Sequence, residues 1–129
     1  MTIASAGVYL TSDASGNATG YTYPITGRIE CVRYTPDPTN PFNTGGGVTI
    51  TGDESKVAIG AKTSFGTSAF TLAFRQPLSA AADGSALTYD GTHAVTDKFC
   101  LSGERVKVVI ASGGNTLSGT FTVVFSTDN

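Results

Sequence analysis

The chain has little of what enzymes and nucleic-acid-binding proteins commonly use. Tryptophan is absent, histidine occurs once, and charged residues make up 14% of the 129 residues, against about a quarter in an average globular domain. Eight basic residues against ten acidic ones give a net charge of -2. Such a count cannot supply the strong basic patch that nucleic-acid binding requires, so we expect no nucleic-acid partner.

Long apolar runs are also missing. No run approaches the roughly 20 residues of a membrane span, so we expect no membrane partner. The N-terminus MTIASAGVYL lacks the basic start and the longer apolar core of a secretory signal. We therefore expect a protein that is made and kept in a cytoplasm until assembly or lysis.

Cysteine occurs only twice, as Cys31 and Cys100. Both lie in apolar stretches, where a free cysteine behaves as a small buried hydrophobe. A reducing compartment favours two buried thiols, and a disulfide is the alternative. Two cysteines alone cannot form a zinc site.

Hydrophobic residues make up 40% of the chain, which is enough for one globular domain with a core of its own. The clearest pattern is alternation with a period of two. Val106, Val108 and Ile110 alternate, SGGN follows, and 117–125 alternate again. Two such runs about a glycine-rich turn predict a β-hairpin.

Similar patterns predict further strands earlier in the chain. Within 25–34, Ile29 and Cys31 fall on one face and Val32 and Tyr34 on the other, which is typical of a central strand. Prolines and glycines predict a loop at 36–47, and 76–96 is predicted as a long excursion with a brief helical turn near 78–82. The other expected strands are 7–11, 18–23, 48–51, 56–61, 68–75 (with Phe70, Leu72 and Phe74 facing inward) and 98–101.

Eight or nine short antiparallel strands with turn signals every eight to twelve residues predict an all-β fold, a single jelly-roll-like β-sandwich over residues 1–129. Residues 1–6 are the candidate for an extended N-terminal arm.

Catalytic patterns are weak. His93, near Asp90 and Asp97, is a candidate general base, but a solvated loop histidine is the ordinary alternative. No Gly-x-Ser-x-Gly elbow supplies a serine nucleophile, and burial would make the Cys100 thiol inert. We expect no catalytic residues.

Metal and cofactor patterns are equally weak. Most carboxylates fall in turns, where side-chain to backbone hydrogen bonds explain them, and no facing pair suggests a glycosidase. DASGN lacks the spacing of a calcium loop, and the glycines at 45–47 lack the Lys-Ser/Thr of a phosphate loop. We expect no cofactor and no metal.

Two groups of residues suggest binding instead. Arg28, Arg33 and Arg75 suit interface ion pairs, with ordinary solvation at strand edges as the alternative. Tyr21, Tyr23 and Tyr34 could form a platform for sugars or bases, with cross-strand packing as the alternative.

Three segments carry a resemblance to a known group: ITGRIECVRYTPD, GVTITGDESKVAI and ERVKVVIASGGNTLSGTFTVVF. Over about residues 25–125 the chain resembles small β-sandwich virion proteins of tailed bacteriophages. The resemblance implies a capsid decoration (cement) protein without catalytic residues. Such a protein binds the major capsid protein on the outer capsid surface, as a homotrimer, and stabilises the shell.

The candidate interface residues come from the N-terminal segment, the 36–47 loop and the arginines: Met1, Thr2, Ile3, Pro38, Phe42, Arg28, Arg33 and Arg75. Alternatives are another virion part (a head–tail joining, tail-tube or baseplate protein, or a head fibre base), a carbohydrate- or receptor-binding module built on Tyr21, Tyr23, Tyr34 and Tyr89, or an enzyme that uses His93.

Overall fold

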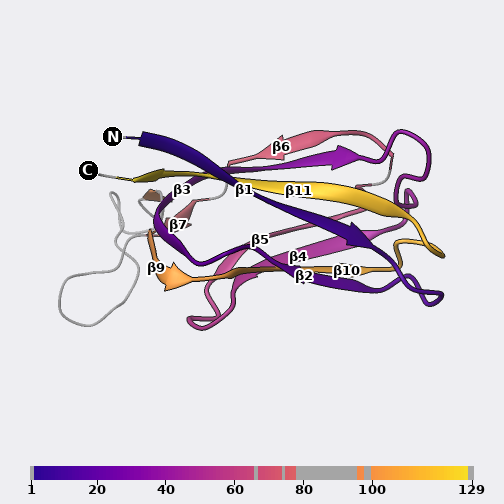
Figure 1. Ribbon diagram of the computed structural model, residues 1–129, viewed down its shortest axis with the longest axis horizontal. Helices are drawn as coiled ribbons and strands as arrows, with labels where there is room; N and C mark the ends of the chain where they lie inside the picture. Colours follow the sequence, from indigo (N-terminus) through magenta and orange to yellow (C-terminus); the bar gives the residue numbers. More distant parts are fainter. Residues whose placement is uncertain (1, 66, 74, 78–95, 98–99, 128–129) are drawn as a thin grey trace, which may run out of the picture.

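The computed structural model describes residues 2–65, 67–73, 75–77, 96–97 and 100–127. Two antiparallel sheets pack face to face, which confirms the predicted β-sandwich (Figure 1). Sheet A has the strand order β1-β11-β3-β6, with β9 also paired to β3, and sheet B has the order β2-β10-β4-β5. A short ladder, β7-β8, lies outside both sheets. The strands are β1 (Thr2–Thr11), β2 (Ala18–Tyr21), β3 (Ile25–Pro36), β4 (Gly47–Gly52), β5 (Ala58–Thr63), β6 (Phe70–Leu72), β7 (Gln76–Pro77), β8 (Thr96–Asp97), β9 (Cys100–Glu104), β10 (Val106–Ala111) and β11 (Ser118–Thr127).

The core lies between the sheets and follows the period-two alternation. In β10 the buried residues are Val106, Val108 and Ile110, and in β11 they include Phe121, Val123 and Phe125. These positions are the inward ones that the alternation predicts. Each fully buried side chain of this size contributes about 1.5–3 kcal/mol to folding.

An aromatic cluster fills one end of the core around Tyr34. Its ring centroid lies 4.9 Å from that of Phe121 and 4.9 Å from that of Phe65. Phe42 stacks on it from the 36–47 loop and is fully buried. Its ring is therefore part of the core, and not on the surface where an interface residue would lie.

The predicted hairpin between β10 and β11 is wrong. β10 pairs with β2 and β4 in sheet B, whereas β11 pairs with β1 and β3 in sheet A. The 112–117 turn carries the chain from one sheet to the other, and Ser12 fastens it by accepting the Leu117 N–H and donating to the Gly114 carbonyl. Alternation reports which side chains face inward. It does not report which strand is the neighbour.

β3 is central, as predicted, but not because it has two apolar faces. It pairs with β11 on one side and with β6 and β9 on the other. Opposite Val124 and Phe125 of β11 lie Cys31 and Ile29, so Glu30 is an extra residue in a β-bulge. The bulge shifts the alternation by one residue, and Ile29 and Val32 consequently both face the core.

The N-terminal segment also differs from expectation. Residues 2–6, predicted as an extended arm, belong to β1 and pair with the last residues of β11, from Thr127 to Val123. Both cysteines are free thiols, but Cys100 is exposed and Cys31 only partly buried, so the expected burial of Cys100 is wrong. The helical turn near 78–82, Phe74 and His93 lie outside the described residues.

Candidate functional site

The outward side of sheet A collects several of the candidate interface residues. Arg28 and Arg33 both project from β3 and are exposed. Five positions separate them, so an unbroken alternation would place them on opposite faces. The bulge at Glu30 brings both to the outer face, beside Ser126 and Thr122 of β11 respectively.

We call this surface the arginine face. Register defines its rows across β1, β11 and β3. Ile3, Ser126 and Arg28 form one row, and Gly7, Thr122 and Arg33 form another. The remaining outward members are Ser5, Tyr9, Thr11, Thr120, Val124, Cys31, Thr35 and Thr71. The face is thus largely uncharged and rich in threonine, with two exposed arginines, both on β3, at one side.

Its borders are held by hydrogen bonds. The Arg75 guanidinium donates to the Glu30 carbonyl at 3.3 Å, and the Ser126 hydroxyl donates to the Glu30 carboxylate at 3.0 Å. Arg75 therefore lies beside the face on which Arg28 and Arg33 stand.

At the opposite end of the face, the hydroxyl of Tyr9 donates to the Asp37 carboxylate at 3.3 Å. The N–H groups of Thr39 and Asn40 also donate to this carboxylate, and these bonds hold its pKa below the ordinary value. Pro38, a candidate interface residue, is exposed in this turn.

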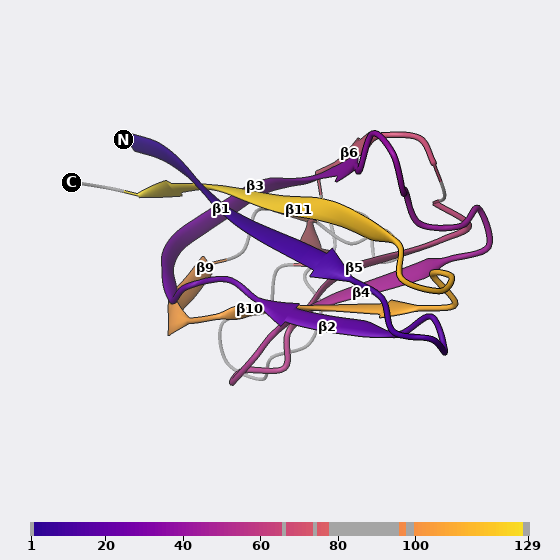
Figure 2. The ribbon, with the colours of Figure 1, turned by 45° about the vertical axis from the view of Figure 1, so that its right-hand side comes forward.

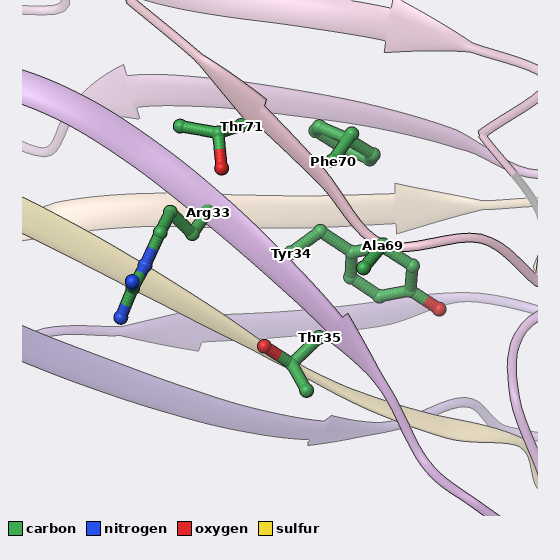
Figure 3. Close-up of a pocket in the computed structure, with 6 residues that line it drawn as sticks. All are labelled: Arg33, Tyr34, Thr35, Ala69, Phe70 and Thr71. Carbon is green, nitrogen blue, oxygen red and sulfur yellow. The ribbon is translucent and has the colours of Figure 1, made fainter.

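A groove of about 440 Å³ opens beside β6 (Figure 3). Arg33 and Thr35 leave β3 on one side, and Tyr34 leaves it on the other, toward Ala69. Burial raises the pKa of the Tyr34 hydroxyl, opposed by a hydrogen bond with the Phe42 backbone. The other lining residues are Phe70 and Thr71. The groove offers one cation, hydroxyls and ring edges, which can hold a partner side chain but include no acid–base pair.

Charges at the margin of sheet B pair with each other. The Arg105 guanidinium lies 2.8 Å from the Asp53 carboxylate and 4.1 Å from the centroid of the Tyr21 ring. The hydrogen bond from Arg105 lowers the pKa of Asp53. The Glu104 carboxylate accepts from the backbone N–H and the hydroxyl of Ser55. These contacts fix the 52–57 turn.

Tyr89 lies outside the described residues, and the other four tyrosines do not share a platform. Tyr9 stands on the outer face of sheet A, while Tyr21 stands on sheet B under Arg105. Tyr23 lies in the exposed connection from β2 to β3, with its hydroxyl on the Ser5 carbonyl and its ring against Phe125. Tyr34 is buried. A sugar could therefore stack on one exposed ring at a time.

The part of the chain that the structure describes has few groupings of reactive or metal-binding side chains. No group of three or more His, Cys, Asp or Glu side chains within it could hold a metal ion. None of its segments forms a helix that could cross a membrane. His93 and Met1 are outside this part, and the predictions made for them stay predictions. Thr2 and Ile3 are exposed on β1.

Sequence reasoning missed the threonine rows and Tyr9. The signal was present as Thr120 and Thr122, which alternate with the inward Phe121 and Val123. Outward threonines on a central strand mark a neutral face, whereas a solvent-facing strand more commonly carries charges.

The fold defines the chain as an all-β sandwich domain. A scan against protein-family models gives no match, and neither does a search of curated proteins. Among solved structures, the chain is similar to FlhE at 12% identity, over 98% of this chain and 100% of that one, with a TM-score of 0.45. At that level the likeness carries no argument about family or function.

Proposed function

We propose that the chain is a structural protein of a tailed-phage virion, a decoration protein that binds the outside of the major capsid shell and stabilises it. The observation that carries the proposal is the arginine face. It is a largely uncharged surface, and it gathers three residues that the sequence alone marked as interface candidates, Ile3, Arg28 and Arg33. The resemblance to small virion proteins supports the same proposal.

The chemistry of the face suits a protein partner. Arginine forms bidentate hydrogen bonds with carboxylates and is less strongly hydrated than lysine, so it is favoured in interfaces. Neutral threonines and serines around Arg28 and Arg33 cost little to desolvate compared with charges. Many weakly bound copies stabilise a shell by mass action, because each binds the assembled state preferentially. Catalysis has no part in this proposal.

A binding assay with shells tests the proposal. Shells stripped of this protein are incubated with the purified chain and sedimented, and we expect saturable binding to the outer surface. Arg28→Glu with Arg33→Glu should weaken binding at least about tenfold, since charge reversal at a rim or interface costs on the order of 1–3 kcal/mol. Lys107→Glu, a single charge reversal on sheet B, is the control for a change of charge away from the arginine face and should bind like the wild type.

Copy number separates this function from another virion role. A shell protein occurs in hundreds of copies per particle, whereas a head–tail ring has about a dozen. Density at the tail alone, in electron microscopy of intact virions, would rule out the decoration role. The resemblance alone implies a homotrimer. The free edge of β1, argued below, favours a two-fold dimer instead, and the mass of the purified chain in solution distinguishes the two.

A further inference from the structure

One edge of sheet A has no partner strand among the described residues. β1 is ten residues long and pairs with β11 along its whole length, but no described strand pairs with its second edge. Figure 2 shows β1 at this margin, beside β11. A free edge presents backbone N–H and C=O groups that another strand can pair with.

The register tells which residues present those groups. Ser12 N–H donates to the Leu117 carbonyl, next to the β1–β11 ladder. Because antiparallel pairs alternate between bonded and non-bonded positions, the even-numbered residues of β1 bond to β11. The odd-numbered residues therefore direct their backbone groups outward. The Ser5 carbonyl agrees, since it accepts a bond from the Tyr23 hydroxyl on that side.

The usual protections of an edge are missing. Natural edge strands carry lysines, prolines or bulges that discourage pairing. β1, with the sequence TIASAGVYLT, has no charged residue and no proline, and its register with β11 is unbroken. Tyr23 covers one carbonyl, but its side chain is 55% exposed and can be displaced.

Gly7 points to what approaches the edge. Glycine inside a strand costs about 0.5–1 kcal/mol relative to alanine, so its presence needs a reason. Gly7 does not have a positive φ, and a Cβ built on it would have no heavy atom within 4 Å. The monomer thus gives no steric reason for it. A glycine in a strand interior often marks a bulge, a bend, or the close approach of a ligand or another backbone, and the unbroken register with β11 excludes the bulge.

We infer that β1 pairs with β1 of a second copy of this chain, antiparallel about a two-fold axis at Gly7. This arrangement places Gly7 opposite Gly7, Ser5 opposite Tyr9, and Ile3 opposite Thr11. All these residues have outward backbone groups, so each facing pair can exchange two hydrogen bonds. No charged residue meets another. The two Tyr9 rings stand diagonal to the paired glycines, which leave room for them.

A charge-swap experiment tests the pairing without depending on shell binding. The wild type should be a dimer in light scattering after size exclusion, with twice the chain mass of 13.2 kDa. Gly7→Lys puts two ammonium groups directly opposite each other and should weaken the dimer about fivefold or more at low salt. Gly7→Glu should do the same, whereas Gly7→Ala, which adds no charge, should remain dimeric.

Mixing is the decisive measurement. The Lys and Glu variants combined should form a heterodimer tighter than either homodimer, because only a two-fold axis at this position brings residue 7 against itself. Circular dichroism confirms that each variant is folded, as the open space at Gly7 predicts. A monomer at all concentrations, a trimer, or a dimer indifferent to both charges would overturn the inference.

Discussion

Gly119 makes the packing of the core directly testable. This residue is buried in β11, paired with Leu10 of β1, and faces the aromatic cluster. A Cβ added there would lie 2.6 Å from the Tyr34 ring and 3.0 Å from the Phe42 ring. Both rings are fully buried and cannot move aside freely. Overpacking of this kind costs about 1–3 kcal/mol.

Gly119→Ala should therefore lower the free energy of unfolding by about 1–3 kcal/mol, even though alanine reduces the backbone entropy of the unfolded state, which by itself favours folding. For a domain of this size each kcal/mol corresponds to roughly 3–5 °C in Tm. Urea unfolding followed by far-UV circular dichroism measures the change, since the chain has no tryptophan.

Gly7→Ala is the matched control for this measurement. The chemistry is the same and the position lies on the neighbouring strand, but the added methyl enters open space. It should leave the stability unchanged or raise it by up to about 1 kcal/mol. If both variants lost stability equally, or if Gly119→Ala lost none, the account of the aromatic cluster would be wrong.

Three further predictions follow from single contacts. Ser12→Ala should cost about 1–3 kcal/mol in urea unfolding, because backbone groups of the 112–117 turn lose their hydroxyl partner; a cost near zero would refute this. In an NMR titration the pKa of Asp53 should lie below its ordinary value and rise toward it in Arg105→Gln. Because the pKa of Asp53 is lower in the folded state, its ion pair with Arg105 stabilises the fold above the unfolded-state pKa, and this stabilisation is lost as pH falls through the folded-state pKa. If the difference in the free energy of unfolding between the wild type and Arg105→Gln did not change over this pH range, the prediction would be contradicted. A maleimide should modify the exposed Cys100 faster than the partly buried Cys31. Equal rates would contradict the difference in exposure between the two thiols.

The sequence predicted the inward positions well because alternation is local. Val106, Val108 and Phe121 face the core as expected, since a strand next to an apolar layer has only two faces to choose from. The pairing of strands could not be predicted in this way, because alternation within a strand does not identify its neighbour in the sheet. The 112–117 turn looked like a hairpin turn, but its bonds to Ser12 direct it across the sandwich.

The candidate site shows the same division. Arginine in a charge-poor chain indicated an interface, but not its location. The bulge at Glu30 decides whether Arg28 and Arg33 share a face, and no residue pattern marked it. The prediction that Phe42 is an interface residue failed for a similar reason. Its neighbours in the sequence mark a loop, but its ring fills a space in the core beside Gly119, which has no side chain.

The proposed dimer and the proposed shell binding reinforce each other in a measurable way. Residues that face each other across an antiparallel pair project to the same side of the sheet. Pairing at β1 would therefore join two arginine faces into one continuous surface, with Arg28 and Arg33 from both copies on the same side. A surface that engages two sites gains avidity of up to about 10²–10⁴ over one. Gly7→Lys, which touches neither arginine, should then lose most of its affinity for shells while Gly7→Ala keeps it. Equal binding by the two variants would mean that a single arginine face is sufficient, and that the free edge of β1 serves something other than the shell.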